Sequence, residues 1–320
     1  MMRLPLVLCA PLLLAIAAPG QGLRRGLVDA DAVFVGRQVG KKPHGDALVL
    51  HRVQVLEGLR GLDGASAVTV LDWPKLSLHN RPTPRQSRLF CLQDASAIAQ
   101  RLGLPGSGAP YFKMVGWSGS HPLIGSDLDR DPIVGFARVL AAGERGVSTS
   151  DTANALASLA VHGAPAVRAE VALYLTERPD LRGKLSSLHW NQLMARATGE
   201  TEDVDYKVAL ATLCAEQRLE GLVDALAVSL GPVTDPRYAR CVGRIAKLLH
   251  GEQATDVLSE RLRNLGRQKD REMVLMAIGA TNTQSALDAL MQMDKQDAAV
   301  IAALREHRSK RAQDAAGKRR

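Results

Sequence analysis

The residues best suited to chemistry gather between Gly116 and Asp131. Ser118 and His121 lie three positions apart in a glycine-rich stretch. A nucleophile and its general base normally come from separate elements, so this spacing is a poor basis for a catalytic triad. Elsewhere the sequence has no Cys-x-x-Cys, His-Glu-x-x-His, phosphate-loop or Gly-x-Ser-x-Gly motif. We therefore interpret the stretch as a turn and predict no catalytic residue.

Acidic residues just beyond this turn raise the question of a metal site. Asp127, Asp129 and Asp131 stand at alternate positions, as oxygen ligands do in calcium loops, and His79 and His121 could add nitrogen ligands. The stretch lacks the glycine and the distal glutamate of such a loop, and an arginine lies among the acids. We favour a solvated linker that ends at a proline, and we predict neither a metal nor another cofactor.

Three cysteines follow the N-terminal segment: Cys91, Cys214 and Cys241. An odd number leaves at least one of them without a disulfide partner. Their apolar surroundings in the sequence favour buried thiols that act as small hydrophobic groups. A disulfide between Cys214 and Cys241 stays open, because it depends on whether successive helices bring them together.

The first residues have the pattern of a signal peptide. Arg3 precedes an apolar stretch, small residues follow at Ala15 and Ala17, and Pro19-Gly20 comes next. The stretch is shorter than the roughly 20 apolar residues of a membrane span, although an uncleaved anchor is the alternative. We predict a signal peptide over residues 1–18 and an exported protein, periplasmic or extracellular.

The chain carries a formal net charge of +8, and its aromatic content is only 3%. Much of the positive charge lies in residues 305–320, which hold seven basic and two acidic side chains. We predict a basic, disordered tail over residues 306–320. The tail is either simply solvated or attracted to an anionic surface of the cell envelope. Nucleic acid is not an expected partner of an exported chain.

The first half of the chain has the short alternating apolar runs of β-strands. Asp94 is a candidate cap for one short helix at 95–102. We predict a small β-domain over residues 23–140. Its expected strands are 32–39, 51–56, 67–71, 88–92 and 111–117.

Three of these segments resemble OB-fold modules of the TIMP/netrin-like family found in exported bacterial proteins. They are residues 29–36, residues 53–61 ahead of 68–70, and residues 88–92. The resemblance implies a small barrel and a binding role. In the animal inhibitors of that family an N-terminal cysteine chelates the zinc of the target. No cysteine lies near the expected mature start here, so inhibition is not implied.

Beyond residue 150 the apolar period becomes helical. We predict a linker over residues 141–150, with a flexible glycine-containing core, and a helical array over residues 151–305. Expected helices lie at 151–161, from Pro165 to about Leu175, and at 207–215, 220–230, 237–249, 253–265, 271–280 and 283–293.

The segment 271–279, followed by 285–290, resembles a unit of the HEAT or phycobilisome-lyase-type repeats. Equivalent first helices recur roughly every 33 to 38 residues, and we count about four pairs. The resemblance implies stacked pairs with one continuous core and a broad face for a protein partner. Residues 182–201 depart from the repeat length and look like an insertion. The fold class is thus multidomain α and β: a five-stranded barrel-like domain, then a HEAT-like array.

These observations favour a non-enzymatic binding or scaffold protein that uses its helical surface for protein–protein interaction. The alternative is an envelope enzyme or enzyme inhibitor with a site in the β-domain loops, near His79, Trp117 and His121. The residues expected to contact a partner are Trp117, His121, Trp190, Arg261, Arg308, Lys310 and Arg311.

Overall fold

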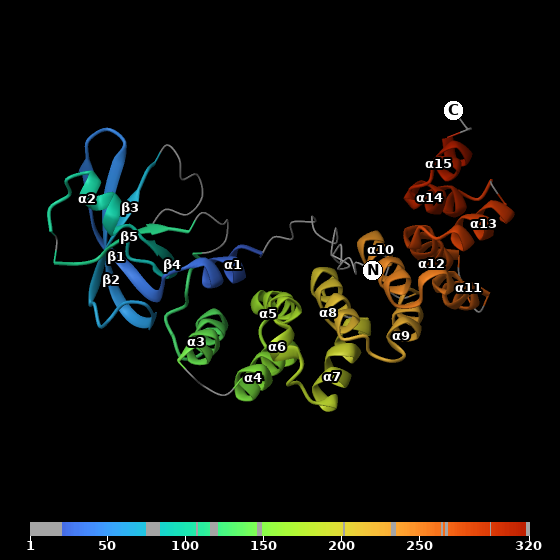
Figure 1. Cartoon of the computed structure of the whole chain (residues 1–320), viewed down its shortest axis with the longest axis horizontal. Coiled ribbons are helices and arrows are strands. Elements are labelled where there is room, and N and C mark those ends of the chain that lie inside the picture. The colour runs from blue at the N-terminus through green and yellow to red at the C-terminus, as the bar shows by residue number, and fades with distance from the viewer. Residues whose placement is uncertain are drawn as a thin grey trace, which may run out of the picture.

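The structure is a computed structural model, and it comprises a closed five-stranded barrel followed by many helices (Figure 1). The elements follow an arc with the barrel at one end and the last helices at the other. The expected signal peptide, His79 and Trp117 lie outside the described residues. Those are 21–74, 84–106, 108–115, 121–145, 149–200, 202–231, 235–263, 265, 268–294 and 296–317.

The barrel confirms the five predicted strands. Neighbouring strands pair in the order β1-β2-β3-β5-β4 and close the sheet, with β3 and β5 parallel and the other pairs antiparallel. The first two strands are longer than expected. The bounds are β1 (Ala32–His44), β2 (Leu48–Arg60), β3 (Ala67–Asp72), β4 (Ser87–Asp94) and β5 (Tyr111–Met114).

Strands β1 and β4 are buried on both faces. Phe34 and Phe90 point into the barrel, where their rings stack with centroids 5.1 Å apart. Their neighbours Val33, Val35 and Leu89 point the other way and join a second core that they share with helices. This explains why β1 begins with an unbroken apolar run instead of an alternating one.

Two helices next to the barrel change the predicted domain boundaries. The first, α1 (Gln21–Asp29), was not predicted, and the second is α3 (Pro132–Glu144). The expected flexible linker over 141–150 is wrong at its start, because Ala141 to Glu144 form the end of α3. Asp131 does not belong to a solvated linker either: its Oδ1 accepts hydrogen bonds from the backbone N–H groups of Ile133 and Val134 and caps α3. Helix α2 (Ser96–Arg101) confirms the predicted short helix, but its N-cap is Ala95 and not the predicted Asp94.

The remaining helices lie in two rows. Successive members of the inner row contact one another, and each has an outer-row helix beside it (Figure 1). The inner row is α5 (Pro165–Glu177), α8 (Val204–Glu216), α10 (Pro236–His250), α12 (Gln268–Thr281) and α14 (Ala298–Glu306). The outer row is α4 (Thr149–His162), α7 (Ser187–Thr198), α9 (Leu222–Ser229), α11 (Ala254–Arg263) and α13 (Gln284–Gln292). Short helices α6 (Pro179–Arg182) and η1 (Gly251–Gln253) lie between them.

The supposed insertion at 182–201 is a regular part of this arrangement. It contains α7, which contacts α8 of the inner row and both α4 and α9 of the outer row. The segment looked irregular because the short helix α6 lengthens the connection before it. None of the described helices is both long enough and apolar enough to cross a membrane.

The C-terminal segment is helical where it is described, so the prediction of a disordered tail is wrong for those residues. Helix α15 (Lys310–Gly317) buries Ala312 and Ala316. His307, three positions before this helix, is buried, and its Nε2 lies 3.0 Å from the carbonyl oxygen of Thr283. Charge dominated the sequence pattern, whereas two alanines four positions apart form the apolar face that docks this helix.

Glycine sets the spacing within the last part of the inner row. A Cβ atom at Gly243 of α10 would lie 2.1 Å from the carbonyl oxygen of Ala277 in α12. A Cβ atom at Gly279 of α12 would lie 2.1 Å from the carbonyl oxygen of Ala303 in α14. Both distances are far below van der Waals contact, so α10, α12 and α14 pack this closely only with glycine at these positions.

Replacing Gly279 by alanine should therefore force α12 and α14 apart. We expect Gly279→Ala to lower the free energy of unfolding by about 1–3 kcal/mol through overpacking. The matched control is Gly135→Ala in α3, where no atom lies within 4 Å of the added Cβ. That change should raise stability by about 0.5–1 kcal/mol, because alanine favours helix more than glycine does. Urea unfolding followed by circular dichroism measures both, and equal effects would contradict the close approach.

Candidate functional site

Arg60, the last residue of β2, joins three elements at the junction of barrel and helices. Its Nη2 donates hydrogen bonds to the carbonyl oxygens of Leu27, in α1, and Ala30, the latter at 2.5 Å. Its Nη1 forms an ion pair with Glu144 of α3. The planar, five-donor guanidinium suits such branched contacts, which a lysine could not reproduce. Arg60 therefore fixes how α1 and α3 sit against the barrel.

A second arginine holds α3 against β2. Arg138 donates from Nε and Nη2 to the two carboxylate oxygens of Glu57, at 2.7 and 2.8 Å, and from Nη2 to Asp129 at 3.1 Å. The hydrogen bonds to Glu57 raise the pKa of Arg138. This bidentate geometry restricts rotation of α3 as well as its distance from the strand.

A third arginine connects α1 to the inner row. The backbone N–H of Arg24 donates to the Glu170 carboxylate of α5 at 3.0 Å, and its side chain reaches the carbonyl oxygen of Leu173 at 3.4 Å and the carboxylate of Glu177. Arg24 and Glu170 are both buried. Burial raises the pKa of Glu170 to about 7 in spite of the opposing pull of Arg24. Helix α1 is thus a strut between the barrel and the helical rows.

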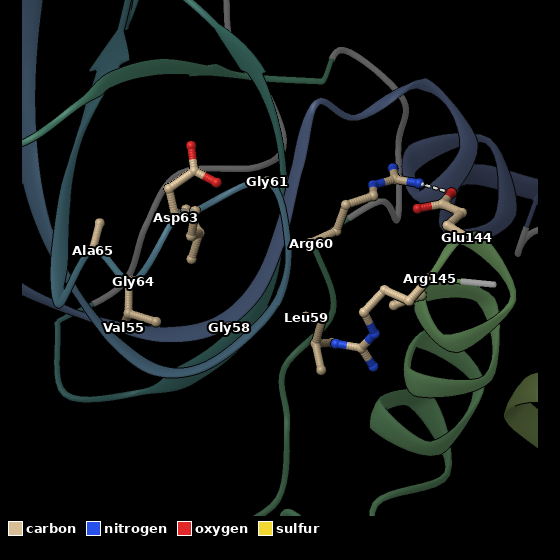
Figure 2. A pocket seen from close by; sticks show the side chains of 12 residues that line it. Val55, Gly58, Leu59, Arg60, Gly61, Asp63, Gly64, Ala65, Glu144 and Arg145 are labelled. Carbon is tan, nitrogen blue, oxygen red and sulfur yellow. Dashed lines mark hydrogen bonds and ion pairs between the residues drawn. The ribbon is translucent and has the colours of Figure 1, made fainter. Parts of the chain in front are cut away.

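A cavity of about 600 Å³ opens beside these clamps, between the β2–β3 turn and the last turn of α3 (Figure 2). Figure 2 shows the Arg60–Glu144 pair on its wall, with Asp63 and Arg145 also on the lining. The lining contains no cysteine, histidine, serine or threonine. Its chemistry is that of hydrogen-bond donors and acceptors of both charges, which suits binding of a polar segment better than covalent catalysis.

Glycine is required at one point of this wall. Gly61 has φ of +65°, and a Cβ atom there would lie 2.0 Å from the carbonyl oxygen of Asp31. The β2–β3 turn therefore rests directly on the backbone ahead of β1. This close approach places the cavity wall independently of the arginine clamps.

His121 is part of the core and not a partner contact, so that prediction is wrong. Its Nδ1 accepts the backbone N–H of Cys91, its Nε2 donates to the carbonyl oxygen of Val115, and its ring lies tilted beside Phe90. Burial lowers the pKa of His121 to about 4, so the ring is neutral at physiological pH. With both nitrogens engaged and the side chain buried, it has neither the access nor the free atom that catalysis or binding needs.

The other rare residue types are also internal. Trp190 of α7 is 5% exposed and belongs to the helical core, so its prediction as a partner anchor is wrong. Cys214 and Cys241 are free thiols, as is Cys91, so the disulfide left open from the sequence is not formed. Burial raises the pKa of Cys91 and Cys214 to about 12 and that of Cys241 to about 11. Such thiols stay protonated and are weak nucleophiles.

The basic candidates separate into two places. Arg261 lies on outer-row helix α11, where its Nη2 donates to the carbonyl oxygen of Val228 at 3.3 Å. Arg308, Lys310 and Arg311 are exposed together at the C-terminal end, around the start of α15. The structure therefore leaves the last three available to a partner and gives Arg261 a structural contact.

The sequence analysis missed a series of cation–tyrosine contacts that joins successive inner-row helices. The guanidinium of Arg168 in α5 lies 4.6 Å from the ring centroid of Tyr206 in α8. The ammonium of Lys207 in α8 lies 4.6 Å from the ring centroid of Tyr238 in α10. A cation over an aromatic face is attracted to its π-electrons, by about 2 kcal/mol where it is desolvated.

The same two tyrosines also reach the outer row. The hydroxyl of Tyr206 donates to the carbonyl oxygen of Ala160 in α4 at 2.5 Å, and that of Tyr238 donates to the carbonyl oxygen of Ala197 in α7 at 2.9 Å. Each tyrosine thus contacts the inner helix before it and the outer helix behind that one. One signal was present in the sequence: both tyrosines stand three positions after an aspartate that caps their helix.

No group of three or more His, Cys, Asp or Glu side chains that could hold a metal occurs among the residues the structure describes. Comparison with known proteins finds no match among family models, curated proteins or solved structures. A functional argument therefore has to come from the surfaces and contacts described above.

Removing Arg60 should weaken the junction without touching the exposed surface. We expect Arg60→Ala to lower the free energy of unfolding by about 2–3 kcal/mol, because two carbonyl oxygens and a carboxylate lose their donor. Arg145→Ala, an exposed residue on the same cavity wall, should change it by less than about 0.5 kcal/mol. Thermal or urea unfolding of the two variants tests this, and a similar small loss in both would show that Arg60 does not hold the junction.

The raised pKa of Glu170 gives the α1 strut a defined pH dependence. Because the folded chain binds this proton more tightly than the unfolded chain does, Glu170 adds stability below its ordinary pKa of 4.5, and this contribution is lost as pH rises through about 7. Glu170→Gln should remove it. When the pH is lowered from 7.5 to 4.5, the free energy of unfolding of the variant minus that of the native chain should become more negative by about 3 kcal/mol. A difference that stays constant with pH would mean that Glu170 titrates normally.

Proposed function

We propose that this chain is an exported, non-enzymatic scaffold whose stacked helices form a HEAT-like solenoid and bind a protein partner on the inner row. The repeated cation–tyrosine contact carries the proposal. Arg168 and Lys207 each stand four positions after the cap of their helix, and each lies over the tyrosine of the next inner helix. The recurrence of one contact at equivalent positions is what a repeat architecture requires.

The last inner-row helices support the same reading with a different contact. Gly243 and Gly279 each let the following inner helix approach at an alanine carbonyl, with the same geometry. The first half of the row is thus joined through cation–tyrosine pairs and the second through glycine. In both halves the coupling runs from one inner helix to the next, which is the nearest-neighbour interaction of a solenoid.

The barrel supports the second part of the proposal. A closed five-stranded barrel with one short helix is compatible with the OB-fold, TIMP/netrin-like interpretation, and that class commonly serves in binding. Here the barrel shares a core and two arginine clamps with the helices, and a third clamp joins α1 to α5. A partner would meet a single preorganised surface, which spares the entropy of ordering two separate domains on binding.

Chemistry supports the non-enzymatic part. Among the described residues, His121 and the thiols Cys91 and Cys214 belong to types that enzymes often use as base or nucleophile, and all three are buried and held in their uncharged forms. The inner row carries a mixture of polar and apolar side chains, such as the half-buried Val208 and Thr212 and the exposed Leu248. That composition suits recognition of a protein surface.

Site-specific photocrosslinking tests which row meets the partner. A photoreactive phenylalanine analogue at Thr212 or Leu248, on the inner row, should give a discrete crosslinked protein in intact cells that make the chain. The same analogue at Leu188 or Val228, which are 64% and 59% exposed on the outer row, should not. Equal crosslinking from both rows, or none from either, would argue against a partner on the inner row.

A further inference from the structure

Five exposed cations lie on α10, within the inner row, and around the start of α15, at its far end; we name them the basic ledge: Arg244, Lys247, Arg308, Lys310 and Arg311. The parts meet at Asn282, at the end of α12. Its carbonyl oxygen accepts a hydrogen bond from the Lys247 ammonium at 3.2 Å. Its side-chain oxygen accepts one from the backbone N–H of Arg308 at 2.6 Å. Arg244 stands one turn before Lys247 on the same face of α10.

The ledge has little negative charge of its own. Glu306 is the nearest carboxylate in sequence to Arg308, and it is already paired with Arg240 at 2.6 Å. Asp314 is exposed on α15, and Glu252, which follows α10, already accepts the backbone N–H groups of Gln284 and Ser285. Within the described residues, the side chains of Arg244, Lys310 and Arg311 form no hydrogen bond and no ion pair.

This contrasts with the arginines elsewhere in the inner row. Arg168 pairs with Glu202 at 3.0 Å, Arg237 with Asp205 at 2.6 Å, and Arg271 pairs with an acid at the start of α14 at 3.3 Å. Each of these pairs joins neighbouring repeats. None of the five cations of the ledge forms such an ion pair with a described residue, although Lys247 donates to the carbonyl oxygen of Asn282.

Helix stability does not explain the ledge either. Lys310 and Arg311 occupy the first turn of α15, and no acid accompanies them there. The helix dipole disfavours positive charge at that end, so both residues cost stability where an acid would add it. Clustered like charges add repulsion. A partner that supplies negative charge would offset both costs.

We propose that the basic ledge binds an acidic segment of a protein partner, through carboxylates placed along α10 and the start of α15. This deepens the proposed function, because it names the chemistry recognised at one end of the inner row. A protein segment fits better than a membrane. Figure 1 shows α10 within the row, between α8 and α12, and α15 at the far end, so the five cations are spread over separate helices along which a flexible acidic chain can place its carboxylates.

Fluorescence anisotropy with a labelled glutamate-rich peptide tests the ledge in the full chain at low salt. Arg244→Glu with Lys247→Glu should weaken binding by at least about tenfold, and Lys310→Glu with Arg311→Glu should do the same. The matched control is Lys41→Glu with Lys42→Glu, which makes the same change of charge at exposed positions of β1. The control should stay within about twofold of the native chain, and circular dichroism should show all variants folded.

Two results would overturn the inference. Equal weakening in the ledge and control variants would show that only net charge matters. Ledge-dependent binding to phosphatidylglycerol vesicles, with no binding of the peptide, would identify a lipid surface as the ligand instead. Neither result would remove the proposed function by itself, because the crosslink at Thr212 reports contact with a partner on α8, away from the ledge.

Discussion

The outer face of β1 and β4 has to be covered, and the rest of the structure follows from how it is covered. Val33, Val35, Leu89 and Cys91 are apolar on the side that faces away from the barrel interior, and a small barrel has no second layer of its own to bury them. Helices α1 and α3 supply that layer. Because the same helices also pack on α4 and α5, a single apolar cluster runs from the barrel into the helical rows and continues to α15.

Hydrophobic contact alone would leave the angle between the barrel and the helices loosely defined, since it is not directional. The arginines at the junction add the direction. Arg60 of β2 contacts α3 and the carbonyl oxygen of Ala30 after α1. Arg138 of α3 contacts β2, and Arg24 of α1 contacts α5. Two of their partners, Glu170 and Glu57, are buried or partly buried, where ion pairs and hydrogen bonds are stronger than at an open surface. The flexible linker expected from the sequence would have allowed independent domains, whereas these contacts fix one arrangement.

Local pattern revealed the elements but not their burial. Alternation and helical period located all five strands and most helices, because these signals depend only on neighbouring residues. Helix α1 was missed because Gly22 and Gly26 make it a weak helix by propensity, and tertiary contacts through Leu23 and Arg24 stabilise it. His121 and Trp190 attracted attention as chemically rare types. Their burial depends on distant segments, which one sequence does not display. The cation–tyrosine contacts likewise join residues more than thirty positions apart.

The distribution of charge separates the parts of the inner row that hold it together from the parts that remain open. In its first half, cations lie over tyrosine rings and pair with carboxylates on or beside the neighbouring inner helix. In its second half, close packing at Gly243 and Gly279 joins the helices together with two ion pairs, Arg240–Glu306 and Arg271–Asp297. The exposed Arg244 of α10 forms no ion pair with a described residue and faces solvent. A row joined by two different contacts can therefore be rigid along its length and still present positive charge at one end.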